Sequence, residues 1–130
     1  MIVVAASVVV TALGDDGPDG DQARLRLGGE RLAAPQVIDL EVTSAWRRLA
    51  SAGEMDQRRA GLAISDLQAL RVDRVGHGPL LGRCWELRAN LNVYDAAYVA
   101  LAELLEVPLL TADAKLRNAP GTRCTIEVLR

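Results

Sequence analysis

Three acidic residues stand where short apolar runs give way to helix-like segments. Glu41 lies in PQVIDLEVTSAWRRLASA, Asp95 in LNVYDAAYVALAELLE and Asp113 in VPLLTADAKL. The first apolar run, MIVVAASVVV, has the same form but carries Ala5 and Ala6 where a fourth acid would complete the set. Converging carboxylates bind hard divalent cations, and such ions promote phosphodiester hydrolysis. The pattern therefore predicts a metal-dependent hydrolytic site that is silenced by the loss of one acid.

The segments around these acids alternate between strand-like and helix-like patterns. We expect strands at residues 1–4, 32–34, 72–75, 107–111 and 122–129. We expect helices at residues 7–13, 21–27, 35–52, 54–70, 79–89, 94–106 and 112–117. This alternation predicts an α/β fold with a central, mostly parallel sheet of four to five strands flanked by helices. The working site of such a sheet lies beyond the carboxyl ends of its strands, where position 5, Asp95 and Asp113 fall.

Local signals set some of the expected boundaries. Ser7 is expected at or near the N-cap of the first helix. The turn-rich GDDGPDG at residues 14–20 predicts a loop. Pro35 is expected to open the helix at 35–52, because proline is tolerated in the first helical turn.

The composition describes a small domain without an obvious membrane segment. A chain of 130 residues has the usual size of one domain. Apolar residues make up 50% but aromatic residues only 3%, so we expect a core of Leu, Val, Ile and Ala, with Trp46 and Trp85 in the core or at an interface. No apolar run is long enough to span a bilayer, and no basic segment precedes the first run. We therefore expect a cytoplasmic protein whose Cys84, on a helix, and Cys124, in the last strand, are reduced thiols.

The charge pattern leaves two interpretations open. The net charge is −2, which is not typical of a nucleic-acid-binding protein. Arginines nevertheless greatly outnumber the single lysine, and several come in pairs such as Arg47 and Arg48. These pairs could contact phosphate, because the guanidinium fork suits that geometry. They could equally be solvated helix faces in an Arg-rich and Ala-rich composition.

Four stretches together resemble a known family. They are MIVVAASVVV, DLEVTSAWRRL around Glu41, HGPLLGRCWELRANLNVYDAAYVALAELLEVPLLTADAKL from His77 to Leu116, and the closing RCTIEVL. The succession of YDAAYVALA and LLTAD is the specific part of the signal. Nearly end to end, the chain resembles the PIN-domain ribonucleases, and within them the VapC-type toxins of bacterial toxin–antitoxin pairs.

The resemblance implies a function and a set of partners. It implies a single PIN domain over residues 1–130 that acts as a Mg²⁺-dependent endoribonuclease toxin, with Mn²⁺ as a second candidate ion and tRNA as the leading candidate substrate. It also implies a homodimer, for which apolar residues around 37–49 and 54–70 could supply the interface. A small VapB-type antitoxin would inhibit the toxin by placing an Arg on the acids, and no membrane partner is expected.

The resemblance also assigns the site. It implies that the catalytic and metal-binding positions are Ala5, Glu41, Asp95 and Asp113. The first and third positions would be the most direct ligands, and the other two would act through water, orient the nucleophile or hold a second ion. Hydrogen bonds from three neighbouring side chains could support the acids: Ser7, Asn92 and Thr111.

Position 5 departs from the family pattern. The first strand of the family normally ends in Asp followed closely by Ser, and the matching text here is Val4-Ala5-Ala6-Ser7. We favour an engineered Asp→Ala change that allows a toxic protein to be produced, and a natural inactive homologue is the alternative. In either case we expect weaker metal binding and cleavage that is slower by orders of magnitude.

Simpler interpretations exist for most of these residues. Asp95 and Asp113 could be helix caps, and Glu41 could be an exposed helix residue. The remaining candidates are expected to have structural roles. They are Asp39, the loop residue His77, and the packing residues Tyr94 and Tyr98. A phosphoacceptor receiver domain is disfavoured, because the first strand ends in Ala-Ala where that class needs an acidic pair. An inactive RNA- or protein-binding module with the same fold is the main alternative.

Overall fold

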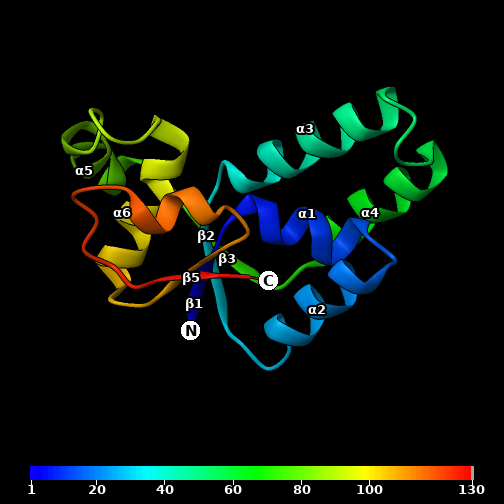
Figure 1. Cartoon of the computed structure of the whole chain (residues 1–130), viewed down its shortest axis with the longest axis horizontal. Helices are drawn as coiled ribbons and strands as arrows, with labels where there is room; N and C mark the ends of the chain where they lie inside the picture. The colour runs from blue at the N-terminus through cyan, green and yellow to red at the C-terminus, as the bar shows by residue number, and fades with distance from the viewer. Residues whose placement is uncertain (130) are drawn as a thin grey trace.

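A five-stranded parallel sheet runs through the middle of the molecule (Figure 1). In the computed structural model, which describes residues 1–129, the strands are β1 (Ile2–Val4), β2 (Leu32–Pro35), β3 (Val72–Val75), β4 (Leu109–Thr111) and β5 (Ile126–Val128). Their order is β3-β2-β1-β4-β5, and every neighbouring pair is parallel. The predicted fold class is therefore confirmed.

The strand order reverses at β1. From β1 the chain builds outward through β2 to β3, and it later returns to place β4 and then β5 on the other side. The crevice at such a reversal, beyond the carboxyl ends of the strands, is where open α/β sheets bind ligands. Residues that follow β1 and β4 therefore meet at this crevice, since Val4 is paired with Leu110.

Helices cover both faces of the sheet. They are α1 (Ala6–Gly14), α2 (Pro18–Leu27), α3 (Ile38–Ser51), α4 (Gln57–Ala69), α5 (Leu81–Glu86) and α6 (Val93–Leu105), with short 3₁₀ helices at Gly78–Leu80 and Ala114–Asn118. The first four helices pack against one another on one side, and α5 packs on α6 on the other (Figure 1). The three central strands are fully buried, as expected for a parallel sheet covered on both faces.

Helix α6 is the most deeply buried helix that borders the site. Residues 96–102 are buried without interruption, and the helix contacts β1, β2 and β4. Its N-terminus is capped by Asn92, whose side chain accepts a hydrogen bond from the amide of Asp95. Its C-terminus ends at Glu106, which adopts the left-handed conformation with φ of 55°. The cap by Asn92 fixes the first turn of α6 beside the carboxyl edge of the sheet.

Several expected boundaries are wrong for identifiable reasons. Pro35 does not open a helix: it is paired with Val75 as the last residue of β2, and α3 begins at Ile38. Pro18 takes the first turn of α2, so the expected loop at 14–20 is shorter. The last strand spans only Ile126–Val128, which places Cys124 in the preceding loop.

The two tryptophans have opposite environments. Trp46 is only 1% exposed and its indole nitrogen donates to the carbonyl oxygen of Val10 at 3.2 Å, which confirms a core position. Trp85 is 67% exposed, so a core position is wrong for it, and the guanidinium of Arg88 lies 4.3 Å from its ring centre. Within residues 1–129, no helix is long and apolar enough to cross a membrane.

Candidate active site

Position 5 lies at the centre of the carboxyl edge. Ala5 directly follows β1, and its amide donates to the carbonyl oxygen of Leu110 in β4 at 2.9 Å. Its own carbonyl oxygen accepts the first hydrogen bond of α1, from the amide of Val8 at 3.1 Å. The residue is 8% exposed and occupies the N-cap of α1, a place expected for Ser7. The backbone there joins β1, β4 and α1, so a side chain at position 5 starts from a fixed point.

Asp95 stands in the first turn of α6. The side-chain oxygen of Asn92 accepts from the amide of Asp95 at 2.8 Å, and the side-chain amide of Asn92 donates to the Asp95 carboxylate at 3.1 Å. Burial raises the pKa of Asp95 and so does the charge of Asp113, whereas the hydrogen bond from Asn92 lowers it. Asn92 therefore holds both the helix end and the carboxylate in place, and it, not Asp95, is the helix cap.

Asp113 follows β4 at the same edge. Its amide donates to the side-chain hydroxyl oxygen of Thr111 at 3.1 Å, and its carboxylate accepts from the amide of Lys115 at 3.0 Å. Asp113 is thus a cap for the following 3₁₀ helix as well as a member of the acidic group. The side-chain oxygen of Ser7 accepts from the amide of Ala112 at 3.0 Å, which ties this turn to the start of α1.

Glu41 reaches the same region from α3. The hydroxyl of Tyr98 in α6 donates to the Glu41 carboxylate at 2.7 Å. Burial raises the pKa of Glu41, the hydrogen bond from Tyr98 lowers it, and the charge of Asp95 raises it. Burial and the neighbouring Glu41 in turn raise the pKa of Tyr98 above its ordinary range, so the phenol stays protonated as the donor. Tyr98 is more than the packing residue that the sequence suggested.

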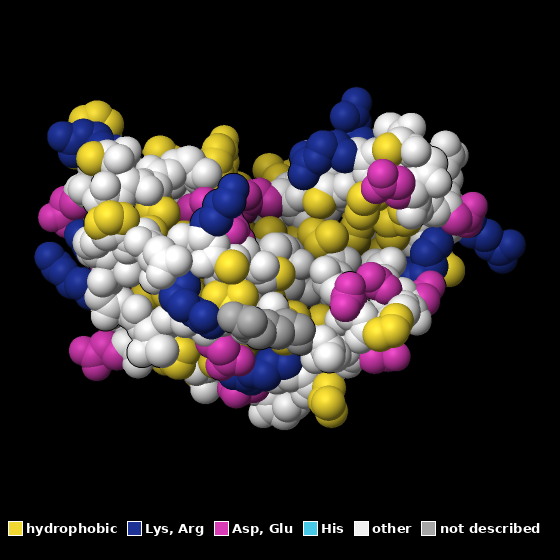
Figure 2. Space-filling model, viewed as in Figure 1, with side chains coloured by type: hydrophobic (Ala, Val, Ile, Leu, Met, Phe, Trp, Pro, Cys, Tyr) yellow, Lys and Arg dark blue, Asp and Glu magenta, His cyan; other side chains and the backbone are white. Residues whose placement is uncertain are grey.

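The three acids therefore form a chain of mutual repulsion. The charge of Asp95 acts on Glu41, and the charge of Asp113 acts on Asp95. In the space-filling view the edge of the molecule is hollowed between the α5–α6 side and the α3–α4 side, and acidic side chains lie at the floor of the hollow (Figure 2). Acids far apart in the sequence are thus close enough in pairs to affect one another, Glu41 with Asp95 and Asp95 with Asp113. Their assignment as a catalytic set stays a prediction.

Comparison with known proteins agrees with this arrangement. Residues 2–121 match the PIN domain family. The chain is 42% identical to Ribonuclease VapC9 of Mycobacterium tuberculosis over 129 residues, which cover 99% of this chain and 98% of that protein. It is 41% identical to Ribonuclease VapC1 of the same organism, over 98% of this chain and 97% of that protein. The chain belongs to the VapC group of the PIN-domain family. The resemblance noted in the sequence is confirmed.

Two solved structures of other proteins share the fold. PAE2754 from Pyrobaculum aerophilum superimposes with a TM-score of 0.70 at 25% identity, over 98% of this chain and 83% of that chain. A chain of VapBC2 from Rickettsia felis, crystallised with a promoter DNA fragment, gives a TM-score of 0.71 over all of both chains at 14% identity. At this level of identity the second likeness concerns the fold alone.

The residues present in this PIN domain do not complete a metal site. Within residues 1–129, no three His, Cys, Asp or Glu side chains are arranged closely enough to hold a metal ion together. The acids have the right chemistry, since carboxylate oxygens are the ligands of Mg²⁺. Burial, and after it the charge of a neighbouring acid, raises the pKa values of Glu41 and Asp95, and a bound cation would offset both effects. Position 5, which the resemblance assigns to the metal-binding set, carries a methyl group and offers no donor atom in its side chain.

The remaining candidates of this PIN domain lie outside the acidic group. His77 uses its side-chain nitrogen Nε2 to accept from the amide of Val37 at 3.1 Å, as befits a structural loop residue. Asp39 pairs with Arg74 at 2.7 Å, which agrees with a structural role. Tyr94 is 57% exposed, so its expected role in packing is wrong. Tyr98 is the functional side chain that sequence reasoning missed, although its position three residues after Asp95 places both on one helix face.

Proposed function

We propose that this chain is the toxin component of a toxin–antitoxin pair: a single PIN domain over residues 1–130, built as an endoribonuclease and inactivated at position 5. The observation that carries the proposal is that Asp95 is close enough to affect both Glu41 and Asp113, at the edge of the sheet where the strand order reverses after β1. The names of its relatives, Ribonuclease VapC9 and Ribonuclease VapC1, support RNA as the substrate. We propose structured RNA, with tRNA as the leading candidate, and a cytoplasmic location.

The chemistry is divided between this chain and an ion that a restored site would bind. A divalent ion at carboxylates supplies charge neutralisation and an activated water. We propose Mg²⁺, or Mn²⁺ in its place, for a chain with Asp at position 5, and we assign no metal-dependent step to the chain with Ala. The protein's own groups hold the acids: Tyr98 orients Glu41, and Asn92 orients Asp95. Thr111 and Ser7 hold the turn that carries Asp113.

An inactive binding module is the second candidate. The specific observation in its favour is that position 5 is Ala and that no closed group of three ligands exists within residues 1–129. Such a module would keep the edge of the sheet as a surface for RNA or protein without cleaving a phosphodiester. The two candidates differ in one property, which is whether a carboxylate at position 5 creates a nuclease.

The partners that we propose follow from the charge and the exposed side chains. Three uncompensated carboxylates are a receptor for the guanidinium of an Arg, so we propose a VapB-type antitoxin that inserts one there. Two solved structures with the same fold support a partner of this kind: VapBC2 of Rickettsia felis bound to promoter DNA, and a toxin–antitoxin complex of Klebsiella pneumoniae. Leu40 on α3 and Leu62 on α4 are exposed and could contribute to a homodimer.

Cleavage of total RNA by the chain and by its Ala5→Asp variant tests the proposal. Each protein is incubated with Mg²⁺, with and without EDTA, and Ala5→Asp combined with Asp95→Asn is the matched control. We expect only Ala5→Asp to cut, and EDTA to stop it. If Ala5→Asp is folded and cuts nothing in a broad RNA panel, the ribonuclease proposal is wrong and the binding module takes its place. The native gene can be sequenced in parallel: a codon other than Asp at position 5 contradicts the engineered origin.

A further inference from the structure

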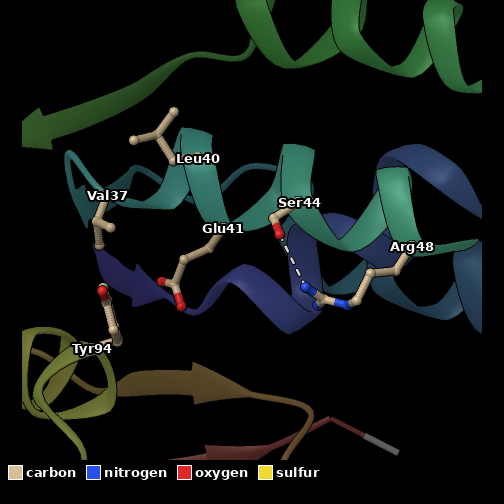
Figure 3. Close-up of a pocket in the computed structure, with 6 residues that line it drawn as sticks. All are labelled: Val37, Leu40, Glu41, Ser44, Arg48 and Tyr94. Carbon is tan, nitrogen blue, oxygen red and sulfur yellow. Dashed lines mark hydrogen bonds between the residues drawn. The ribbon is translucent and has the colours of Figure 1, made fainter.

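A cavity opens beside the acidic group, between α3 and the start of α6. Its volume is about 370 Å³, within the range of small-molecule sites, about 300–1,000 Å³. One face of α3 supplies most of its wall: Val37, Glu41, Ser44 and Arg48. These positions recur every three or four residues, so their side chains share one side of the helix. Figure 3 shows them pointing to one side, with Tyr94 of α6 standing opposite Val37.

Glu41 belongs to both the cavity and the acidic group. Its carboxylate lines the cavity and also accepts the hydrogen bond from Tyr98. Tyr94 precedes Asp95 in the first turn of α6. A molecule in the cavity would therefore lie directly beside Glu41.

Arg48 is a cation whose charge is not neutralised. Its guanidinium donates to the side-chain oxygen of Ser44 at 3.0 Å, shown by the dashed line in Figure 3. Among residues 1–129 it forms no ion pair with a carboxylate, unlike several arginines that do: Arg24, Arg26, Arg31, Arg59, Arg74 and Arg83. This bond holds the guanidinium at the level of Ser44, three residues or about one helical turn from Glu41. An anion bound by Arg48 would thus lie about 5 Å along the helix axis from the position of Glu41.

Tyr94 offers an aromatic surface to solvent. It is 57% exposed and reaches the cavity opposite the apolar side chain of Val37. Exposed aromatic rings beside an arginine are the usual means by which proteins bind single-stranded nucleic acid, since bases stack on the ring and phosphates contact the cation. A base inside a duplex cannot reach such a ring, because it is stacked and paired.

We propose that this cavity binds one unpaired nucleotide of the RNA substrate, with its base against Tyr94 and Val37 and a neighbouring phosphate on Arg48. The proposal rests on the proposed ribonuclease function and adds to it the residues that hold the substrate beside the cleaved bond. The acids then act on a phosphodiester next to the held base. Tyr94 and Arg48 are substrate-binding residues, and neither takes part in bond cleavage.

Binding is measured with the chain as it stands, because Ala5 prevents cleavage from disturbing the equilibrium. The probe is a short fluorescein-labelled single-stranded RNA of mixed sequence, and its fluorescence anisotropy is followed over a salt series. We expect Tyr94→Ala to weaken binding about tenfold, within the range for loss of one stacked base, without changing the salt dependence. Tyr94→Phe keeps the ring and should bind normally. Arg48→Ala should weaken binding and reduce the slope of log K against log salt by about 0.7, the value for one phosphate contact on a single strand.

Two exposed residues away from the cavity supply matched controls. Trp85 is an exposed aromatic residue that does not line the cavity. Arg71 is exposed and precedes β3, so it lies at the opposite edge of the sheet. Trp85→Ala should retain affinity, and Arg71→Ala should retain the salt slope. If these controls weaken binding as much as the cavity variants, binding is diffuse and the inference is wrong. A duplex of the same sequence should bind equally to the chain and to Tyr94→Ala, and a loss as large as with the single strand also contradicts it.

Further outcomes separate the cavity from the ribonuclease proposal. In the Ala5→Asp background, Tyr94→Ala and Arg48→Ala should raise KM about tenfold, as expected from the loss of binding. If Ala5→Asp cleaves RNA and both variants keep its KM, the cavity inference fails while the ribonuclease proposal stands. If Ala5→Asp cleaves nothing, the ribonuclease proposal fails and the anisotropy measurement still decides the cavity. If Tyr94→Ala changes the sedimentation coefficient but not the RNA affinity, the cavity is a contact between copies and the inference is overturned.

Discussion

The hydrogen bond from Tyr98 to Glu41 makes a quantitative prediction. Tyr98→Phe removes the hydroxyl and leaves the Glu41 carboxylate without its 2.7 Å donor. Hydrogen bonds to charged groups contribute about 1.5–3 kcal/mol, and because Glu41 is only half-buried, water replaces part of the loss. We therefore expect the free energy of unfolding to fall by about 1.5 kcal/mol. For a domain of this size that is a decrease in Tm of about 4–9 °C.

The charge on Glu41 sets the pH dependence of this effect. The pKa of Glu41 in the folded protein is raised above its ordinary value of 4.5, chiefly by burial. Its ionised form is thus disfavoured by folding, and Glu41 lowers stability at neutral pH and ceases to do so as the pH falls through its folded pKa. The Tyr98 hydrogen bond then joins two neutral groups, worth about 0.5–1.5 kcal/mol. The penalty of Tyr98→Phe should therefore shrink on acidification.

A double-mutant cycle provides the assay. Urea unfolding is measured for the chain, Tyr98→Phe, Glu41→Gln and the double variant, at neutral pH and below the folded pKa of Glu41. Glu41→Gln keeps an acceptor oxygen without charge, so we expect a coupling of about 1 kcal/mol at neutral pH that disappears in acid. Tyr94→Phe is the control and should be neutral. A coupling within the additivity error of about 0.3–0.5 kcal/mol, or a penalty independent of pH, would refute the reasoning.

Three further predictions follow from the same edge of the molecule and from α1. Burial and the charge of Asp113 raise the pKa of Asp95, so Asp95→Asn should raise the free energy of unfolding at neutral pH. The gain should vanish as the pH falls through the folded pKa of Asp95. Urea unfolding over a pH series checks this, and a gain that is constant with pH contradicts it. Mg²⁺ should raise the Tm of Ala5→Asp by several degrees and that of the unchanged chain by much less, and differential scanning fluorimetry showing equal shifts would contradict a role for position 5 in binding. Gly14→Ala should destabilise the fold by about 1–3 kcal/mol despite the better helix propensity of Ala, because the added Cβ would lie 2.5 Å from the indole nitrogen of buried Trp46. Gly61→Ala is the control. No atom lies within 4 Å of the Cβ that it would add, so it should not destabilise the fold.

Some parts of the fold could be predicted from the sequence because short-range signals decide them. The buried strands β1 and β4 are runs of aliphatic residues that fit little else, and Asn92 before VYDA is a plain helix start. Pro35 was misplaced because proline suits both a first helical turn and a strand end. The decision comes from outside the local sequence, where the following Gln36 donates to the carbonyl oxygen of Val75 in β3.

The candidate site shows the same division. Position 5 after β1 and Asp113 after β4 could be placed together, since a parallel sheet brings its carboxyl ends to one edge. The contact between Tyr98 and Glu41 could not, because it joins α3 to α6 across 57 positions and depends on how the two helices pack. The two tryptophans were equally ambiguous, because both lie on helices among apolar residues. The packing of α1 on α3 buries Trp46, whereas Trp85 on α5 is left exposed.

The central place of β1 has a consequence for the order in which the chain is made. The partner of β1 on one side, β2, lies within residues 1–35, whereas its partner on the other side, residues 109–111, is made much later. Asp113 also arrives only then. An unfinished chain therefore presents an open β1 edge and an acidic group lacking one member. If the restored protein is a ribonuclease, the ribosome that synthesises it is protected from it until Asp113 has emerged.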